Sequence, residues 1–370
     1  MDFSLADDQQ AAVDLTRQIL TDHGAPEVLR EVESGSEWFH REAWQALASA
    51  DLLGLCLPEP VGGGGYGFLE ACLLLQEVGR TVMPIPLWST LTASLTIAAF
   101  GSAELQQARL PGVVDGSTIL TVALDEVDAD AREPYLRTDA DGDGWRLSGT
   151  KTAVPAVHLA SHMLVPARDR EDGLHVFVVP TDAAGVAAQL QDTFNHEPRF
   201  HVDLDGVAVG AGDQLAGGGT TLNWLVDRAT VGLCAVASGV SDGGMRRTAE
   251  YAKDRKQFDR PIGSFQAVGH RMADCFIDNE AIRLTMFQAA THLDRGERVD
   301  SQVAVAKYWA AYGGRRVGHA DLHLHGGISI DLDYPIHRYF LWAKQLENTL
   351  GAATPQLATL GSIIASPSPS

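Results

Sequence analysis

The segment from Arg255 to Gln266 holds the residues best suited to binding a charged ligand. It combines a guanidinium, an aromatic ring at Phe258 and a side-chain amide at Gln266. A proline and a glycine interrupt it, which predicts a loop between two helical patterns, 229–253 and 267–293. A guanidinium at a helix end can clamp a phosphate through paired hydrogen bonds, or can complement the negative end of the helix dipole. For an arginine considered alone, the helix-dipole role is favoured.

A second polar stretch, 322–328, carries His323, His325 and the pair Gly326–Gly327. Glycine after a helical pattern is typical of a helix C-terminus. The histidines, together with His337, lack acidic residues at the spacing of a metal site. The residues alone therefore favour a helix end with packed histidines, and no metal site is predicted.

Taken as a whole, the first segment resembles a loop of flavin-dependent acyl-CoA dehydrogenases, whose pattern is Arg-x-x-Phe-Gly-x-x-Ile-x-x-Phe-Gln. The matching positions are Arg255, Phe258, Ile262, Phe265 and Gln266. The family's glycine is replaced by Asp259. Segment 322–328 resembles the Gln-x-x-Gly-Gly segment of the same family, with His323 in place of the glutamine. Further matches at 1–5, 57–63 and 149–151 extend the resemblance over nearly the whole chain.

This resemblance implies binding of FAD and of an acyl-CoA thioester, with α,β-dehydrogenation of the acyl group as the reaction. It assigns cofactor binding to Arg255, Phe258, Gln266, His323, Gly326 and Gly327. In the family, these motifs reach across a subunit interface to the FAD of a neighbouring chain. The reduced flavin would pass its electrons to an acceptor such as an electron-transfer flavoprotein.

The family also supplies a carboxylate base for the α proton, at one of two positions. In this sequence those positions hold Leu350 and Ala229, neither of which can accept a proton. Ala352 likewise stands where the family has a threonine that can bond the flavin. Glu347 lies one helical turn before Leu350, and Asp227 would point about 200° away from Ala229 on a helix.

Both of these acids have simpler roles available. Glu347 can pair with Lys344 or Arg338 on the surface, and Asp227 can cap the start of a helix. Structural roles are favoured for both acids, and Glu347 is the better fallback candidate for the base.

The segment 124–129 also departs from the family, which has Thr-Glu-Pro and then Gly-Ser-Asp there, facing the flavin and the thioester. Residues 153–155 replace an aromatic-Ile-Thr segment. The residues that a subunit offers to its own flavin are therefore largely absent, whereas those aimed at a neighbour's flavin are kept.

This division predicts a partner-type subunit of a heteromeric acyl-CoA dehydrogenase, a heterotetramer like the paired actinobacterial enzymes of steroid degradation. A homo-oligomer of the same family is the simpler form of that hypothesis. The alternative is a catalytically silent structural subunit that completes a partner's FAD site or has lost flavin. The absent carboxylate also leaves other flavin or acyl-CoA chemistry open.

The elements that must position these residues fall into three blocks. Residues 1 to about 115 have helical patterns, including 41–50, with Trp44 and Leu47 in a core, and an apolar helix over 68–82. The first helix is expected to run to about residue 20 and to be capped by Asp7 or Asp8. From 221 to 365 the pattern is again helical.

Between the helical blocks, short β-branched segments alternate with turns such as 141–144. The predicted strands are 118–124, 135–138, 145–149, 162–166, 174–179 and 200–204.

The order of blocks predicts an α+β multidomain protein that suits the acyl-CoA dehydrogenase fold. Its expected parts are an N-terminal α-helical domain over 1–116, a middle β-barrel or sandwich over 117–216, and a C-terminal four-helix bundle over 217–365 that mediates oligomerisation. The tail 366–370 is expected to be disordered.

Composition sets the remaining bounds. The chain has 370 residues, 45% of them hydrophobic, enough for two or three domains. A net charge of −20 argues against nucleic acid as a partner. No apolar run approaches the ~20 residues of a membrane span, and no basic-then-apolar signal follows Met1, so a cytoplasmic protein is expected. Four scattered cysteines are expected to be buried free thiols.

Overall fold

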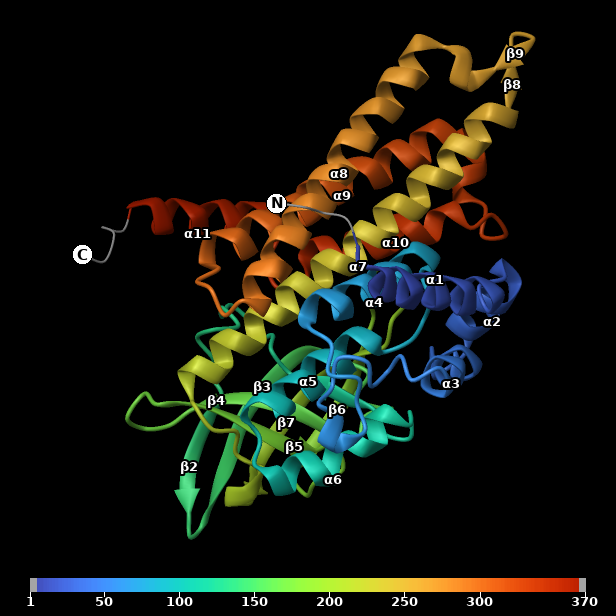
Figure 1. Cartoon of the computed structure of the whole chain (residues 1–370). Helices are drawn as coiled ribbons and strands as arrows, with labels where there is room; N and C mark the ends of the chain where they lie inside the picture. The colour runs from blue at the N-terminus through green and yellow to red at the C-terminus, as the bar shows by residue number, and fades with distance from the viewer. Residues whose placement is uncertain (1–4, 366–370) are drawn as a thin grey trace. The chain divides into compact units, whose positions relative to one another are not determined.

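Residues 5–365 are described by a computed structural model; the predictions for the first four residues and for the tail 366–370 lie outside this range. The chain divides into two compact units. Unit 1 comprises Met1–Glu31, Cys72–Met83 and Thr230–Ser370, and unit 2 comprises Val32–Ala71 and Pro84–Ala229. Unit 1 is mostly helical, whereas unit 2 holds the seven-stranded sheet and shorter helices (Figure 1).

Unit 2 contains the helices α3 Arg41–Ser49, α5 Leu87–Phe100 and α6 Ala103–Val114, followed by seven strands. The strands are β1 Leu120–Val122, β2 Arg137–Asp141, β3 Gly144–Pro155, β4 His162–Arg168, β5 Leu174–Pro180, β6 Val186–Gln191 and β7 Arg199–Val209. Helices α2 Pro26–Ser34 and α4 Phe68–Thr81 have residues in both units.

The strands form one sheet in the order β1-β4-β2-β3-β7-β6, with β5 paired to β4. β1 and β2 run parallel to β4, and the other pairs are antiparallel. The predicted turn at 141–144 closes the β2–β3 hairpin, because Asp141 pairs with Gly144. Side chains such as Leu147, Phe177 and Val202 are fully buried in the core of the sheet. The strand β6 was not predicted, because its mostly exposed side chains show no apolar alternation.

Unit 1 is built on long helices: α1 Asp7–Asp22, α7 Gly219–Asp254, α8 Gln266–Asp294, α9 Asp300–His325, α10 Ile336–Asn348 and α11 Ala353–Ala365, of which α7 begins in unit 2. α8, α10 and α11 pack against α9. The order of helical, β and helical blocks confirms the predicted fold class. None of the described helices combines the length and hydropathy that crossing a bilayer requires.

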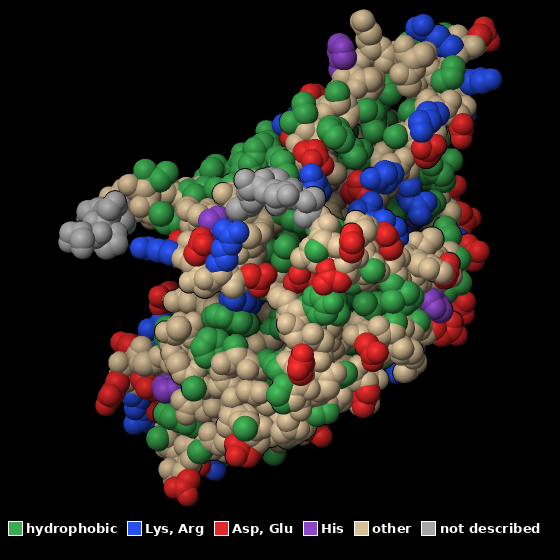
Figure 2. Space-filling model, viewed as in Figure 1, with side chains coloured by type: hydrophobic (Ala, Val, Ile, Leu, Met, Phe, Trp, Pro, Cys, Tyr) green, Lys and Arg blue, Asp and Glu red, His purple; other side chains and the backbone are tan. Residues whose placement is uncertain are grey.

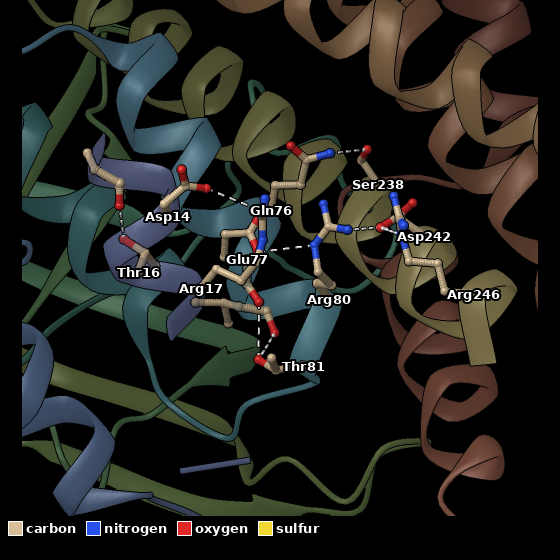
Figure 3. Close-up of polar contacts among 12 residues, drawn as sticks. Asp14, Thr16, Arg17, Gln76, Glu77, Arg80, Thr81, Ser238, Asp242 and Arg246 are labelled. Atoms are coloured by element: carbon tan, nitrogen blue, oxygen red, sulfur yellow. Dashed lines mark hydrogen bonds and ion pairs between the residues drawn. The ribbon is translucent and has the colours of Figure 1, made fainter. Parts of the chain in front are cut away.

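Buried charges join α1, α4 and α7 within unit 1. Figure 3 shows Arg17 and Arg80 converging on Glu77, with nitrogen-to-oxygen distances of 2.9 Å and 3.0 Å. Arg80 also pairs with Asp242 of α7, which in turn accepts from Arg246. The Glu77 carboxylate is almost fully buried, so its two arginines supply the compensation that a buried charge requires.

Helices α4 and α7 also pack closely against each other within unit 1, at positions occupied by glycine. A Cβ on Gly239 of α7 would lie 1.9 Å from the carbonyl oxygen of Gln76, and one on Gly79 of α4 would lie 2.0 Å from that of Val236. No side chain fits at such distances, so both positions require glycine as long as the helices keep this separation.

Gly239→Ala is therefore expected to destabilise the protein by about 2 kcal/mol or more, because overpacking against backbone outweighs the gain in helix propensity. Gly361→Ala on α11 is the matched control: a Cβ there meets nothing within 4 Å, and the change should add up to about 1 kcal/mol. Urea unfolding of the two variants measures both effects. A Gly239→Ala protein as stable as the parent would contradict the close approach.

Several local predictions are settled by these elements. Trp44 and Leu47 are buried, and all four cysteines are buried free thiols, as predicted. The predicted cap of the first helix is wrong, because Ala6 occupies the N-cap position and both aspartates lie in the first turn. There their charges still complement the positive end of the helix dipole.

Candidate functional site

The Arg255 segment forms a small β-hairpin between α7 and α8. Strand β8 Lys256–Gln257 pairs antiparallel with β9 Arg260–Pro261, and a turn of two residues connects them. The hairpin is anchored at its base by main-chain bonds: the Arg255 N–H donates to Tyr251 (2.8 Å), and the Ile262 N–H donates to Arg255 (2.8 Å). The backbone of Arg255 is thus fixed at the end of α7.

The turn of this hairpin holds Phe258 and Asp259 at φ +53° and +62°. Positive φ at both central residues defines a type I′ turn, which normally favours asparagine, aspartate or glycine. Asp259 thus adopts a positive φ, which glycine would tolerate most easily and aspartate tolerates better than most residues. A positive φ is strained for a bulky residue such as Phe258. The Phe258 side chain is also 88% exposed, so an apolar ring at a strained position faces solvent. Strain of this kind indicates a functional surface.

The Arg255 guanidinium is exposed and makes no side-chain hydrogen bond or ion pair with any residue in the described range. Gln266, the first residue of α8, is also exposed and its amide is likewise unbonded there. Lysine and arginine side chains gather at this end of unit 1 (Figure 2), where Lys256 and Arg260 flank the turn. Arg260 is already engaged, because its guanidinium lies 4.0 Å from the ring centroid of Phe265. Arg255 is thus a cation presented without a partner of its own.

The second predicted segment lies at the end of α9. Gly326 terminates the helix at φ +64° and ψ −143°, a conformation open to glycine alone, so the predicted helix C-terminus is confirmed. A Cβ on Gly327 would meet nothing within 4 Å. No contact within the described chain therefore requires glycine at position 327. The space beside Gly327 is open. His323 is exposed on the last turn of the same helix.

These two segments are brought together by a residue that the sequence did not single out. Tyr251, one turn before Arg255, stacks on His325, the residue before Gly326, with ring centroids 4.4 Å apart. An aromatic residue one helical turn before Arg255 was the available signal, but nothing in the sequence places the two helix ends side by side.

At the first position for a base, the chain offers no carboxylate. Leu350 follows α10 at φ +53° and is half-buried. Glu347 pairs with Lys344, at 2.6 Å, as predicted for a structural role. Buried Lys307 caps the end of this helix by donating to the carbonyl of Leu346 (2.7 Å). The fallback acid is thus held in an ion pair at a helix end.

At the second position, in unit 2, Ala229 is fully buried and its carbonyl accepts a bond from Trp88 Nε1 (2.9 Å). The predicted capping role of Asp227 is wrong, because α7 starts at Gly219 and Asp227 lies in its interior. The Asp227 carboxylate instead pairs with Arg132 at 2.7 Å. Trp88 thus packs against α7 at this position.

A cleft of about 600 Å³ in unit 2 contains none of the predicted site residues. Several of its polar groups are bonded within the chain: Arg41 pairs with Glu37, His158 bonds the Glu37 carbonyl, and Trp44 donates to Gly116. The cleft therefore gives no sign of a ligand.

Behind the Gly326 turn lies a buried acid. Asp321 is 2% exposed and accepts a hydrogen bond from Thr248 Oγ1 (2.7 Å). Burial raises the pKa of Asp321 to about 7, against the lowering effect of that hydrogen bond. Because the folded state holds this proton more tightly than the unfolded state, the stabilising contribution of Asp321 is fully present below about pH 4 and is lost as the pH rises through about 7.

Asp321→Asn is expected to flatten this dependence, making the variant about 2 kcal/mol more stable than the parent at pH 8 but not at pH 4. Urea unfolding at the two pH values measures the difference. Asp143→Asn, in an exposed turn, is the control and should change neither value. Equal effects of Asp321→Asn at both pH values would contradict the burial of a titrating carboxyl.

Comparisons with known proteins bear on the whole chain. The sequence matches the "Acyl-CoA dehydrogenase, N-terminal domain" family over residues 6–117 and the "Acyl-CoA dehydrogenase, C-terminal domain" family over residues 217–364. It is 40% identical over 370 residues to acyl-CoA dehydrogenase FadE27 of Mycobacterium tuberculosis, covering 98% of each chain.

Two solved structures are similar throughout. One is a variant of the Tcur3481-Tcur3483 steroid ACAD, with a TM-score of 0.94 and 45% identity over 98% of this chain and 99% of that one. The other is the ChsE4-ChsE5 complex from Mycobacterium tuberculosis, with a TM-score of 0.95 and 39% identity over 100% of both chains.

Proposed function

Because this chain belongs to the acyl-CoA dehydrogenase family, we propose that it is a flavin-completing subunit of a heteromeric, FAD-dependent acyl-CoA dehydrogenase. Members of the family oxidise the CH–CH bond of acyl-CoA thioesters and bind FAD, which supplies the acceptor for the hydride. In this proposal, the present chain holds part of a neighbour's FAD, and the base that removes the α proton comes from that neighbour.

The observation that carries the proposal is the Arg255 guanidinium, which is exposed and unbonded among residues 5–365. A guanidinium binds phosphate oxygens through paired hydrogen bonds, and Arg255 would hold the diphosphate in this way. The exposed Gln266 amide and the open space at Gly327 also fit a dinucleotide. Phe258 would cover an apolar part of the cofactor or of the neighbouring chain, and His323 would add a polar contact.

The absence of a free carboxylate at either family position supports a site in which this chain binds the flavin and the partner supplies the base. Leu350 and Ala229 cannot take a proton, and the carboxylates of Glu347 and Asp227 are each held by a cation. A base must be free to accept a proton near the operating pH. A carboxylate committed to an ion pair meets that condition poorly, so we assign the base to the partner chain.

Exposed apolar side chains on the elements that carry or follow the motifs support an oligomer. Ile330 and Leu332, which follow the glycine turn, are 82% and 73% exposed, and Phe276 and Ile277 on α8 are more than half exposed. Large apolar residues that gather near a binding motif are typical of a surface covered by another chain. The partner would cover them while placing its FAD against Arg255.

The similar structures suggest the kind of partner and substrate. Both are named as pairs of different chains, and one is named as a steroid ACAD. By this analogy we propose a second acyl-CoA dehydrogenase chain as partner, an acyl-CoA with a steroid-derived acyl group as substrate, and an electron-transfer flavoprotein as acceptor.

The test is expression of this chain alone and with candidate acyl-CoA dehydrogenase chains from the same genome. We expect the chain alone to be colourless and inactive, and one co-purified complex to be yellow and to reduce ferrocenium with an acyl-CoA substrate. Stoichiometric flavin and full turnover from this chain alone would overturn the proposal. A stable complex without flavin would instead identify a structural subunit.

Glu347→Gln in that complex tests the assignment of the base. Because the ion pair with Lys344 is partly exposed, we expect turnover to change less than about threefold and unfolding by less than about 1 kcal/mol. Loss of a catalytic base typically costs 10²-fold or more in rate. A loss of that size, with flavin retained, would show that Glu347 is the base. Glu250→Gln, which breaks an exposed pair with Lys253, is the control.

A further inference from the structure

The two motifs that would hold the FAD come from the ends of different helices. Arg255 is the first residue after α7, and Gly326 is the first residue after α9. Both can contact one dinucleotide only if the separation of these helix ends is fixed. The contacts that fix it are therefore part of the site, even where they do not touch the cofactor.

Tyr251 makes a hydrogen bond to each of the two motifs. Its main-chain carbonyl accepts from the Arg255 N–H (2.8 Å), and its hydroxyl donates to the His325 carbonyl (3.3 Å). Its ring also stacks on the His325 imidazole, with ring centroids 4.4 Å apart and planes inclined by 25°. Tyr334 packs beside both rings, 5.3 Å from His325 and 6.3 Å from Tyr251. One residue thus joins the start of the hairpin, through its main chain, to the start of the glycine turn, through its side chain.

The orientation of His325 is also fixed. Its Nδ1 lies 2.8 Å from the main-chain oxygen of Asp321, so Nδ1 carries the proton and donates. Nε2 is buried and has no partner among the described residues. Burial lowers the pKa of His325, which keeps the ring neutral. The Asp321 carboxyl is bound in turn by Thr248 of α7, so a second contact joins the same two helices.

We propose that Tyr251 and His325 are positioning residues that hold the Arg255 hairpin and the Gly326–Gly327 turn at the separation needed to grip one FAD. This inference rests on the proposed function, because it requires the cofactor to contact both motifs. Stacked aromatic rings at helix ends also occur as ordinary packing. The two roles differ in what they predict: packing affects stability alone, whereas positioning affects FAD affinity through Arg255.

The first experiment measures FAD affinity in the apo-complex by quenching of flavin fluorescence, and thermal unfolding in parallel. His325→Ala is expected to weaken FAD binding about tenfold, and Tyr251→Phe, which loses only the hydroxyl bond, about threefold to tenfold. His325→Phe keeps a ring for stacking and should restore affinity to within about threefold of the parent. If His325→Ala does not fold, the other two variants still decide the question.

The second experiment is a double-mutant cycle with Arg255→Ala. If Tyr251 acts through Arg255, adding Tyr251→Phe to Arg255→Ala should weaken FAD less than about twofold further. Additive losses, or variants that lower the unfolding temperature while FAD affinity stays within twofold, would overturn the positioning role and leave the proposed function standing. A parent complex that binds no FAD, or that is indifferent to Arg255→Ala, would overturn both.

Discussion

Arg255→Ala is expected to weaken FAD binding by the heteromeric complex about 10- to 100-fold while leaving the fold intact. A hydrogen bond to a charged group contributes about 1.5–3 kcal/mol, which corresponds to that range of affinity. The side chain is exposed and unbonded within the described chain, so its removal should change the free energy of unfolding by less than about 0.5 kcal/mol. Gel filtration followed by flavin quantitation, and direct titration with FAD, measure the loss.

Two variants separate the role of Arg255 from general charge effects. Arg260→Ala removes an equal charge from the same hairpin, but this guanidinium is stacked on Phe265 and should matter less than about threefold. Arg255→Lys keeps the charge and loses the paired geometry, so an intermediate affinity is expected. Equal losses for Arg255→Ala and Arg260→Ala would mean that only net charge matters. Unchanged flavin retention by Arg255→Ala would remove the basis of the proposed function.

Local patterns in the sequence were sufficient to predict most of the framework. The proline and glycine after Arg255 predicted the break between α7 and α8, and the glycine pair predicted the end of α9. The turn at 141–144 was predicted because its residues favour a tight hairpin, and Asp141 does pair with Gly144. These features depend on residues near one another in the chain.

What could not be predicted depends on contacts between distant residues. Asp227 was expected to begin a helix because aspartate is a good cap, but its partner is Arg132, far away in the sequence. The stack of Tyr251 on His325 requires two helices to end side by side, which no local pattern encodes. The closeness of Gly239 to Gln76 likewise becomes apparent only when α4 and α7 are placed together. The predicted site residues lie on recognisable motifs, whereas Tyr251, which helps to hold them in place, does not.

The segment after β1 illustrates how the chain holds a region that the family uses at its flavin. Glu126 forms an ion pair with Lys151 of β3, and both side chains are almost completely buried. The Glu126 carboxylate also accepts main-chain N–H bonds from Tyr135 (2.6 Å) and Leu136 (3.2 Å). Burial lowers the pKa of Lys151, and the charge of Glu126 opposes that shift. The segment is thus held by a buried ion pair, and removal of either charge would lower the free energy of unfolding.

Glu126→Gln is therefore expected to destabilise the protein by about 3–5 kcal/mol, because it leaves a buried ammonium without its counter-charge. Lys151→Met added to it should recover about 2 kcal/mol or more, since no buried ammonium is then left without a counter-charge and methionine fills the volume of the lysine stem. The glutamine oxygen can still accept one of the two N–H bonds. Urea unfolding of the parent, both single variants and the double variant gives the coupling energy. Additive losses would contradict the pairing.

The pH dependence gives an independent check on the same pair. In Glu126→Gln the charge that opposes the lowered pKa of Lys151 is gone, so the folded state binds this proton more weakly than the unfolded state does. Stability should then rise with pH between the lowered folded pKa and the ordinary lysine value of about 10.4. The double variant, which has no lysine at this position, should lack that rise. If Glu126→Gln shows the same pH profile as the double variant, the folded and unfolded states bind the Lys151 proton equally, and the cost of the single variant must come from lost hydrogen bonds.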